Sequence, residues 1–271
     1  MIETFVKATL AEDVGRGDLF ARIFPPKPTE AKVIAKSEGI FCGALYLDAL
    51  AKLESFSIAY RKNDGERFTQ GETLLHVSGD SHTVLKIERT LMNMLLHASS
   101  IATLTRKYVD IVAPYGVKLL DTRKTRPMLR NFEKYAARAG GAINHRMGLD
   151  DSLMLKDTHL KTIDDLAAFM REARKKIPFT CKIEIEAESV EDAKKAMEAG
   201  ADIVMCDNMS PKQIEEVVAY RNGNHPRVLL EASGNIALET IENYAETGID
   251  AISSGSFIHQ SRWIDLSMKV E

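Results

Sequence analysis

The second half of the chain alternates short apolar segments with segments of helical spacing, and this alternation constrains the fold more than any other feature. Repeated strand and helix units over about 150 residues predict a parallel α/β barrel or, failing that, an open doubly wound sheet. Fewer than eight clear strands can be counted, so closure of the barrel stays open. Strands are expected at 117–120, 152–155, 181–187, 202–206, 228–231 and 250–253, and helices at 129–139, 163–175, 190–199, 211–221 and 238–247.

The N-terminal part follows another pattern, because its strand-like segments suit a small antiparallel unit. A long helical stretch follows, and Ala98-Ser99-Ser100 is expected to mark a break in it or a tight crossing between two helices, since small residues allow close approach. Helices are expected at 2–10, 42–53 and 81–112, a loop at 11–18, and strands at 31–35, 56–60 and 73–77.

Composition and charge indicate a soluble globular protein of 271 residues, with 45% hydrophobic and 28% charged residues. The net charge of −3 argues against nucleic-acid binding, which usually shows as a strongly basic face. No apolar run reaches the roughly 18 residues that span a bilayer, and the N-terminal segment lacks the layout of a signal peptide, so a cytoplasmic protein is expected. Cys42, Cys181 and Cys206 follow no metal or disulfide spacing and are expected as reduced core residues.

Polar residues follow the predicted strands at their carboxyl ends, which is where the working residues of α/β barrels lie. The first strand runs into Asp121-Thr122-Arg123-Lys124-Thr125-Arg126-Pro127, where proline ends any ladder because it has no N–H. From Asp121 to His159 the chain carries eight Lys or Arg against five Asp or Glu, although its total charge is −3. A polar, cation-rich mouth is therefore predicted, and its later strand ends are Lys156-Asp157, Asp207-Asn208, Glu231 to Asn235 and Ser253 to Ser256.

The segment Lys182-Ile183-Glu184-Ile185-Glu186-Ala187-Glu188 alternates charged and apolar residues with the period of a strand. If the isoleucines face the surrounding helices, the carboxylates point into the barrel, where uncompensated charge is costly. Cations or a metal must then balance the negative charge of these carboxylates. The available partners are Lys124, Arg146 and Lys156, with Asp207 adding a carboxylate. The alternative is an edge strand whose glutamates face solvent.

Two short motifs, Ser233-Gly234-Asn235 and Ser254-Gly255-Ser256, each follow a strand and precede a helical segment. Backbone N–H groups at such places bind phosphate oxygens well. With the cations and with inward carboxylates that could hold Mg²⁺ or face a developing cation, they predict a site for a phosphorylated sugar. No Ser-His-Asp or zinc-like spacing occurs. By residue type alone, Arg89 is expected as a surface charge, and His97 and His145 as structural hydrogen-bonding residues.

Several motifs resemble those of the quinolinate phosphoribosyltransferase family, which belongs to the type II phosphoribosyltransferases. They are Glu88 to Asn93, His97 to Thr103, Asp121 to Pro127, Gly141 to Asp150, Leu155 to His159, Glu184 to Glu188, Asp207 to Met209, Glu231 to Ile236 and Ser254-Gly255. The resemblance runs through nearly the whole chain. It implies an N-terminal α/β sandwich over 1–105, with 260–271 packing back on it, and an incomplete α/β barrel of about seven strands over 106–259.

The resemblance further implies that quinolinate and phosphoribosyl pyrophosphate give nicotinate mononucleotide, pyrophosphate and CO2 in NAD biosynthesis, with Mg²⁺ as cofactor. Carried over by position, the residues Arg123, His145, Arg146 and Lys156 bind the quinolinate carboxylates, and Arg89 does so from the neighbouring subunit of a homodimer that shares its active site. Assembly beyond the dimer, such as a hexamer, stays open. The other implied site residues are Lys124 and Lys156 at the reaction centre, Glu186 and Asp207 for ribose and Mg²⁺, Thr122 for substrate, and Ser233, Gly234, Asn235, Ser254 and Gly255 for phosphate with His259 nearby.

Two positions depart from the family pattern, which usually has Gly where Ser100 stands and Thr where Phe20 follows Gly-Asp. Neither is an implied site residue, so the departures bear on the helix crossing and the N-terminal loop. One rival reading is a related phosphoribosyltransferase with another acceptor, such as the paralogue associated with molybdate transport operons, although a monocarboxylate acceptor would not need so many arginines. The other is a non-catalytic phosphate-binding barrel, which would leave the inward carboxylates idle.

Overall fold

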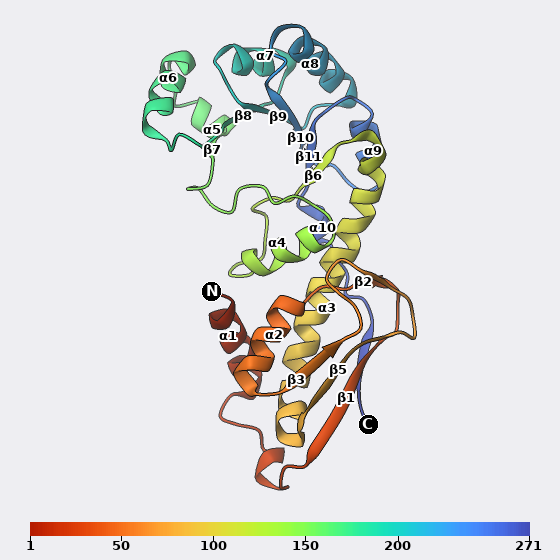
Figure 1. Cartoon of the computed structure of the whole chain (residues 1–271). Helices are drawn as coiled ribbons and strands as arrows, with labels where there is room; N and C mark the ends of the chain where they lie inside the picture. The colour runs from red at the N-terminus through yellow and green to blue at the C-terminus, as the bar shows by residue number, and fades with distance from the viewer. The chain divides into compact units, whose positions relative to one another are not determined.

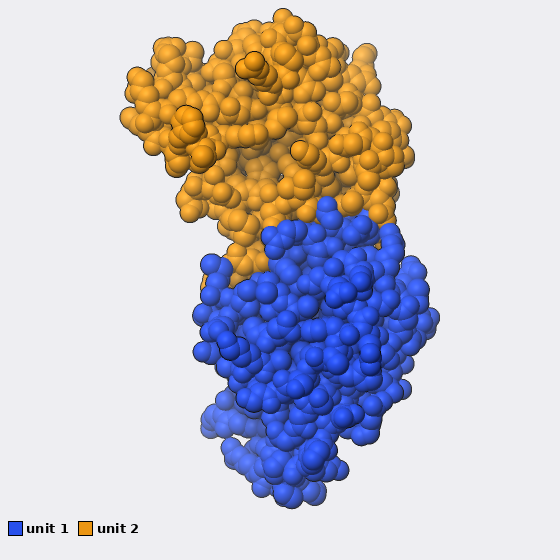
Figure 2. Space-filling model, viewed as in Figure 1, with its two compact units in different colours: residues 1–106, 135–141, 261–271 blue, residues 107–134, 142–260 orange.

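The computed structural model describes all residues 1–271 and divides into two compact units (Figures 1 and 2). Unit 1 comprises residues 1–106, 135–141 and 261–271, and unit 2 comprises residues 107–134 and 142–260. None of its helices combines the length and the apolar character needed to cross a membrane. All three cysteines are free, as predicted; Cys42 and Cys206 are buried, whereas Cys181 is partly exposed and is not a core residue.

Unit 1 is built on a four-stranded antiparallel sheet in the order β12-β1-β5-β3. Ala31, Val33 and Ala35 alternate with more exposed residues along β1 and are fully buried, which is the pattern of a sheet with one covered face. Helices α1 and α2 contact each other, with the rings of Phe5 and Tyr46 5.4 Å apart. The elements of this unit are α1 (Ile2–Val14), η1 (Phe20–Arg22), β1 (Pro28–Ala35), β2 (Gly39–Ile40), α2 (Ala44–Glu54), β3 (Ser57–Tyr60), β4 (Arg67–Phe68), β5 (Thr73–Asp80), most of α3 (Ser81–Val112) and β12 (Leu266–Val270).

Two local expectations for this unit were wrong. Helix α1 continues to Val14 instead of giving way to a loop at residue 11, because the chain stays helical until Gly15, which adopts a positive φ of 53°. Helix α3 runs without a break through Ala98-Ser99-Ser100. The small residues serve close packing instead: the Ser99 hydroxyl accepts the Cys42 N–H at 3.0 Å and donates to the Cys42 carbonyl at 3.1 Å.

The serine at position 100 also fits into this uninterrupted helix. Its hydroxyl donates to the Leu96 carbonyl at 2.6 Å and accepts the Ile264 N–H at 3.0 Å. Phe20, the other departure from the family pattern, stacks on Phe24 with ring centroids 5.3 Å apart.

Unit 2 contains a six-stranded, fully parallel sheet in the order β6-β11-β10-β9-β8-β7. Helices follow the strands in turn, and two of them are capped by Ser189 and Ser210, whose side chains accept backbone N–H groups. The elements are η2 (Ala113–Tyr115), β6 (Lys118–Leu120), α4 (Arg130–Ala139, which ends in unit 1), β7 (Leu153–Leu155), α5 (Asp157–Leu160), α6 (Leu166–Lys176), β8 (Ile183–Ala187), α7 (Val190–Glu198), β9 (Ile203–Asp207), α8 (Pro211–Asn224), β10 (Leu229–Ser233), α9 (Ile241–Ala245), β11 (Ala251–Ser253) and α10 (Ser256–His259).

The sheet is an incomplete barrel, as expected, but it has six strands and not about seven. The segment between β6 and β7 reaches the sheet through a single parallel bridge from Ile143 to Leu120. The next two residues, Asn144 and His145, donate to the carboxylate of Asp121 and not to a neighbouring strand. Only the His145 bond comes from a backbone N–H, because Asn144 donates from its side-chain amide. The Asp121 carboxylate therefore takes one hydrogen bond that a seventh strand would have used, and the barrel stays open beside β7.

Candidate active site

A cavity of about 340 Å³ opens at the carboxyl ends of the parallel strands. Every strand of the sheet ends within two residues of one of its lining residues, which is the place where α/β barrels carry their working groups. Cations, carboxylates and hydroxyls dominate the lining. The lining residues are Thr122, Arg123, Lys124, His145, Arg146, Met154, Lys156, Glu186, Met205, Asp207, Glu231, Ser233 and Ser253.

A second cavity of about 200 Å³ adjoins the first and shares Thr122, Lys124, Ser233 and Ser253 with it. Its wall is formed by the loops after β10 and β11. Gly234 has a φ of +92°, and a side chain there would collide with the Asn208 amide; a methyl group at Gly255 would lie 3.2 Å from Lys124 Cβ and from the Thr122 hydroxyl. Glycine is thus required at position 234, and a methyl group at position 255 would crowd the cup. A narrow cup with glycine loops is an arrangement that suits a phosphate.

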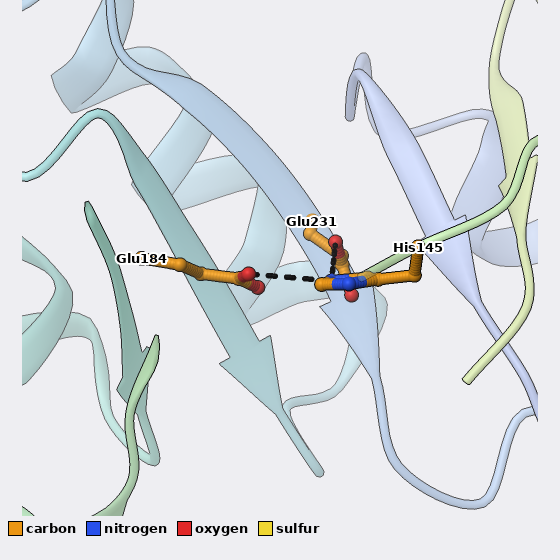
Figure 3. Close-up of side chains that lie close together, drawn as sticks. All are labelled: His145, Glu184 and Glu231. Atoms are coloured by element: carbon orange, nitrogen blue, oxygen red, sulfur yellow. Dashed lines mark ion pairs between the residues drawn. The ribbon is translucent and has the colours of Figure 1, made fainter. Parts of the chain in front are cut away.

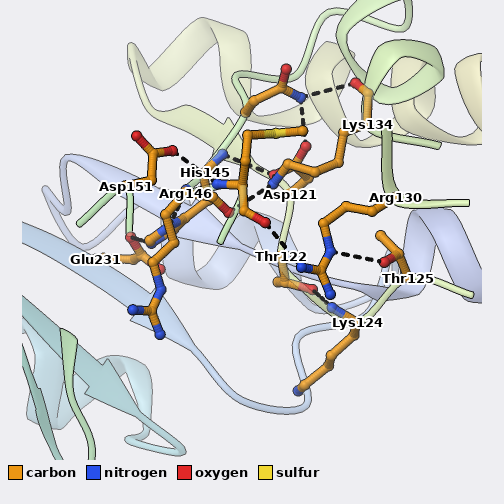
Figure 4. Close-up of polar contacts among 12 residues, drawn as sticks. Asp121, Thr122, Lys124, Thr125, Arg130, Lys134, His145, Arg146, Asp151 and Glu231 are labelled. Atoms are coloured by element: carbon orange, nitrogen blue, oxygen red, sulfur yellow. Dashed lines mark hydrogen bonds and ion pairs between the residues drawn. The ribbon is translucent and has the colours of Figure 1, made fainter. Parts of the chain in front are cut away.

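Asp121 holds the segment that carries His145 and Arg146, which line the larger cavity (Figure 4). Its carboxylate is fully buried and accepts from the Asn144 amide at 2.6 Å, from the His145 N–H at 2.8 Å and from the ammonium of Lys134. Lys134 is also fully buried and donates to the Arg146 carbonyl at 3.3 Å. The charge noticed at the end of the first strand is therefore an internal ion pair that fixes the backbone of residues 144–146.

On the cation-lined side of the larger cavity, Arg146 forms no salt bridge, although the charge of Glu184 acts on it. Arg146 is 9% exposed, and its guanidinium donates to the Ser152 carbonyl at 3.0 Å and reaches Met154 Sδ at 3.4 Å. Burial and the neighbouring charge of Arg123 lower the pKa of Arg146. Two guanidinium groups that disfavour each other's charge gain stability when an anion binds between them, and planar guanidinium groups match carboxylates in geometry.

The opposite side of the same cavity has excess negative charge. Glu186 is 7% exposed and pairs with the ammonium of Lys156. Burial and the charge of Glu186 raise the pKa of Asp207, and the charges of Lys156 and Lys124 only partly offset this effect. Two carboxylates held close together in a partly buried site favour a cation between them, and carboxylate oxygens are the ligands that Mg²⁺ prefers. The donor set therefore fits a hard divalent cation.

A third polar cluster lies at the floor of the cavity, where His145 meets two buried glutamates (Figure 3). His145 Nε2 lies 3.2 Å from Glu184 Oε2 and 3.4 Å from Glu231 Oε2, and the two glutamates are 0% and 2% exposed. The three ligand atoms lie within 4.8 Å of one another, close enough to hold a metal. A proton on Nε2 lets the ring pair with both carboxylates at these distances, and a nitrogen that carries this proton has no lone pair for a metal.

Two features have opposite effects on whether Nδ1 of His145 carries a proton in addition to the one on Nε2. Burial lowers the pKa of His145, but its contacts with Glu184 and Glu231 more than compensate and raise that pKa to about 10. The Arg146 N–H, by contrast, points at Nδ1 from 2.7 Å and favours an unprotonated Nδ1. Two buried carboxylates outweigh one N–H dipole, so the raised pKa prevails and the Arg146 contact is given up when Nδ1 gains a proton.

Comparison with known proteins matches both parts of the chain to one family. Residues 101–269 match the model of the quinolinate phosphoribosyl transferase C-terminal domain, and residues 18–99 match the model of the N-terminal domain. The chain belongs to the quinolinate phosphoribosyltransferase family. Together the two matches cover almost all of the sequence, including each loop that lines the cavities.

Curated relatives and solved structures agree with this family assignment. The chain is 37% identical to a probable nicotinate-nucleotide pyrophosphorylase (carboxylating) of Methanothermobacter thermautotrophicus, over 98% of this chain and 97% of the relative. A protein of the same name from Bacillus subtilis is 38% identical over 96% and 90%. The solved nicotinate-nucleotide pyrophosphorylase of Francisella tularensis superposes with a TM-score of 0.92 at 34% identity, covering 100% of this chain and 96% of that one.

All but one of the site residues expected for a quinolinate phosphoribosyltransferase line one of the two cavities. The exception is Arg89, which lies exposed on α3 in unit 1. The roles assigned to these residues stay predictions. Lining the larger cavity are Thr122, Arg123, Lys124, His145, Arg146, Lys156, Glu186, Asp207 and Ser233, and the smaller one adds Gly234, Asn235, Ser254, Gly255 and His259.

Sequence reasoning missed the groups that support these residues. Lys134 and Asn144 carry no pattern that would place them against Asp121, because their partner lies on another element. Glu184 was expected to point inward, but its partner was sought among lysines and arginines and proved to be His145. Alternation along a strand predicts the face on which a residue lies and does not predict the side chain opposite to it.

Proposed function

We propose that this chain transfers the phosphoribosyl group of phosphoribosyl pyrophosphate to quinolinate and releases CO2, giving nicotinate mononucleotide and pyrophosphate in NAD biosynthesis. The observation that carries the proposal is the pair of adjoining cavities, in which a cation-rich pocket for a dicarboxylate continues into a glycine-lined cup for phosphate. The family membership and the names of the full-length relatives support the same activity.

Quinolinate would bind at the cation-rich side. Its two carboxylates would give Arg123 and Arg146 negative partners, and Lys156, which pairs with Glu186, lines the same cavity. In the proposed mechanism, the same cations stabilise the negative charge that the ring develops as its carboxylate next to the nitrogen leaves as CO2. His145 lines the same wall, next to Arg146 in the sequence.

Phosphoribosyl pyrophosphate would extend from the carboxylates into the cup. Glu186 and Asp207 would hold the ribose and face the positive charge that develops on it as pyrophosphate departs, so no enzyme nucleophile is required. Glu186 and Asp207 would also hold Mg²⁺, which when bound supplies positive charge for the leaving pyrophosphate. Lys124 lines both cavities and would contact the charged substrates where the two cavities join. The 5′-phosphate would lie on the loops at Ser233 to Asn235 and Ser254-Gly255.

The proposal includes a homodimer in which Arg89 of one subunit serves the site of the other, in a cytoplasmic enzyme. Arg89 is exposed on a helix of unit 1 and is available for such a contact. The family resemblance supports the dimer, and its test is given with the whole molecule below.

The decisive experiment supplies phosphoribosyl pyrophosphate and Mg²⁺ with either quinolinate or nicotinate and measures CO2 and nicotinate mononucleotide. We expect product and CO2 from quinolinate alone, because a monocarboxylate leaves part of the cation-rich wall without a partner. The Lys156→Ala variant is the control for contaminating activity. Turnover of nicotinate without quinolinate turnover would assign the site to a different acceptor, and turnover of neither would refute the proposed reaction.

A further inference from the structure

The glutamates at the floor of the larger cavity have no role in the function proposed above. Glu186 and Glu231 both pair across the sheet with Met205 on β9, so they lie at one level. Glu184 pairs with Ile203, two residues further from the strand ends, and lies one layer deeper. Glu184 is fully buried and does not line the cavity, whereas Glu231 lines it with only 2% of its surface exposed. Burying two carboxylates next to a site for a dianion is unfavourable, so their presence there requires a physical explanation.

His145 is the group that lies at ion-pair distance from both glutamates, with its Nε2 3.2 Å and 3.4 Å from their oxygens. Both carboxylate oxygens of Glu184 and Oε1 of Glu231 are buried without a hydrogen-bond partner, so Glu184 meets His145 as an ion pair. Figure 3 shows the two side chains, from β8 and β10, converging on the tip of the imidazole ring. The ring is therefore held at its Nε2 end by charge from two different strands, while its backbone N–H is held by Asp121.

We propose that Glu184 and Glu231 are positioning residues that anchor the Nε2–H end of His145 on the cavity floor, and thereby fix the wall formed by His145 and Arg146 against which the acceptor's carboxylates bind. This inference deepens the proposed function and rests on it for the identity of the acceptor. Glu184 and Glu231 act through His145 and touch no substrate atom.

Two physical effects of these glutamates on acceptor binding have opposite signs. As bare negative charges beneath the site, they repel a dianionic acceptor, so their removal would tighten binding. As anchors of His145, they hold a cationic wall in place, so their removal would weaken binding. An ordered wall retains affinity that a mobile one loses to conformational entropy. We infer that the anchoring effect is the larger of the two while His145 is present.

The test uses Glu184→Gln and Glu231→Gln, which keep the side-chain shape and remove the charge. We expect the Kd for quinolinate to rise roughly tenfold in each variant, the size of effect that follows from losing one charge-assisted contact. The KM for phosphoribosyl pyrophosphate should stay within about twofold of the wild-type value, because the phosphate loops are untouched. Unchanged or tighter quinolinate binding would overturn the inference.

A double-mutant cycle separates anchoring from a general loss of stability. In the His145→Ala background only the repulsion remains, so Glu231→Gln should now tighten quinolinate binding, reversing its sign. Asp202→Asn and Asp250→Asn are the controls, because these carboxylates accept the Ile183 N–H at 2.6 Å and the Leu230 N–H at 2.7 Å at the opposite ends of β8 and β10. Weakening of equal size with and without His145 would assign Glu231 a structural role and refute the anchor.

A spectroscopic arm needs no acceptor. The ring NH signals of the seven histidines can be recorded in the ligand-free protein, and the His145 signal is identified by its loss in His145→Ala. We expect a slowly exchanging Nε2–H in the wild type and faster exchange in Glu184→Gln and Glu231→Gln. Identical exchange in all three proteins would overturn the anchor. If the wild type fails to bind quinolinate but shows the expected exchange, the proposed function fails and the anchor stands.

Discussion

At the scale of single residues, Asp121 and Lys134 show how a buried ion pair can set the geometry of a site that neither residue lines. Both are fully buried, and between them they hold the backbone of residues 144–146. Burial raises the pKa of Asp121 and lowers that of Lys134, because it disfavours the charged form of each. Each charge is therefore tolerable only while its partner is present.

The Lys134→Met variant tests this dependence. It leaves the Asp121 carboxylate buried without its cation, and we expect a loss of about 3–5 kcal/mol in the free energy of unfolding, measured by urea denaturation. The double variant Asp121→Asn, Lys134→Met should recover part of that loss, since it removes both charges. A single variant within about 1 kcal/mol of the wild type would show that water or another group compensates Asp121.

The ionisation of His145 predicts a pH dependence of stability. Its pKa is raised to about 10 in the folded chain, whereas an unfolded histidine titrates near 6.5. A raised pKa stabilises the fold fully below about 6.5, and this stabilisation is lost as the pH rises towards about 10. We therefore expect the free energy of unfolding to fall less steeply with pH over this window in Glu231→Gln than in the wild type. The exposed-site variant Glu239→Gln is the control, and equal slopes in all three proteins would contradict the raised pKa.

At the scale of elements, sequence pattern located the parallel strands well, because buried strands read as short apolar runs between helices. All six predicted strands of unit 2 exist within a few residues of their expected limits. The missing seventh strand and the uninterrupted helix α3 could not be predicted, since both depend on partners distant in sequence. The Asp121 carboxylate takes the backbone N–H of His145, and Cys42 accounts for the small residue at position 99.

The loop between β11 and α10 can be tested through Gly255. A methyl group there would lie 3.2 Å from Lys124 Cβ and 3.3 Å from the His259 ring, and so would narrow the cup. We expect Gly255→Ala to raise the KM for phosphoribosyl pyrophosphate roughly tenfold and to change that for quinolinate little. Gly223→Ala, where an added methyl meets nothing within 4 Å, is the matched control. Equal effects on both substrates would show that the loop does not select phosphate.

At the scale of the whole molecule, Arg89 is the test of a shared site. We expect Arg89→Ala and Lys156→Ala to be inactive alone and to recover activity when mixed, because a hybrid dimer contains one site free of both substitutions. Random exchange of equal amounts should restore about one quarter of wild-type activity. Mixing Arg89→Ala with Arg89→Gln is the control and should restore none. No recovery after confirmed subunit exchange would refute the shared site.

The opening of the barrel beside β7 has a consequence for how this protein family can diversify. The residues expected to read the acceptor, His145 and Arg146, follow the lone bridge at Ile143 and are held by side chains and not by a strand ladder. Their segment can change length or composition without breaking the register of any strand pair. If the proposed function holds, acceptor choice and scaffold integrity are encoded in separate stretches of the chain, and a change of substrate requires no change in the sheet.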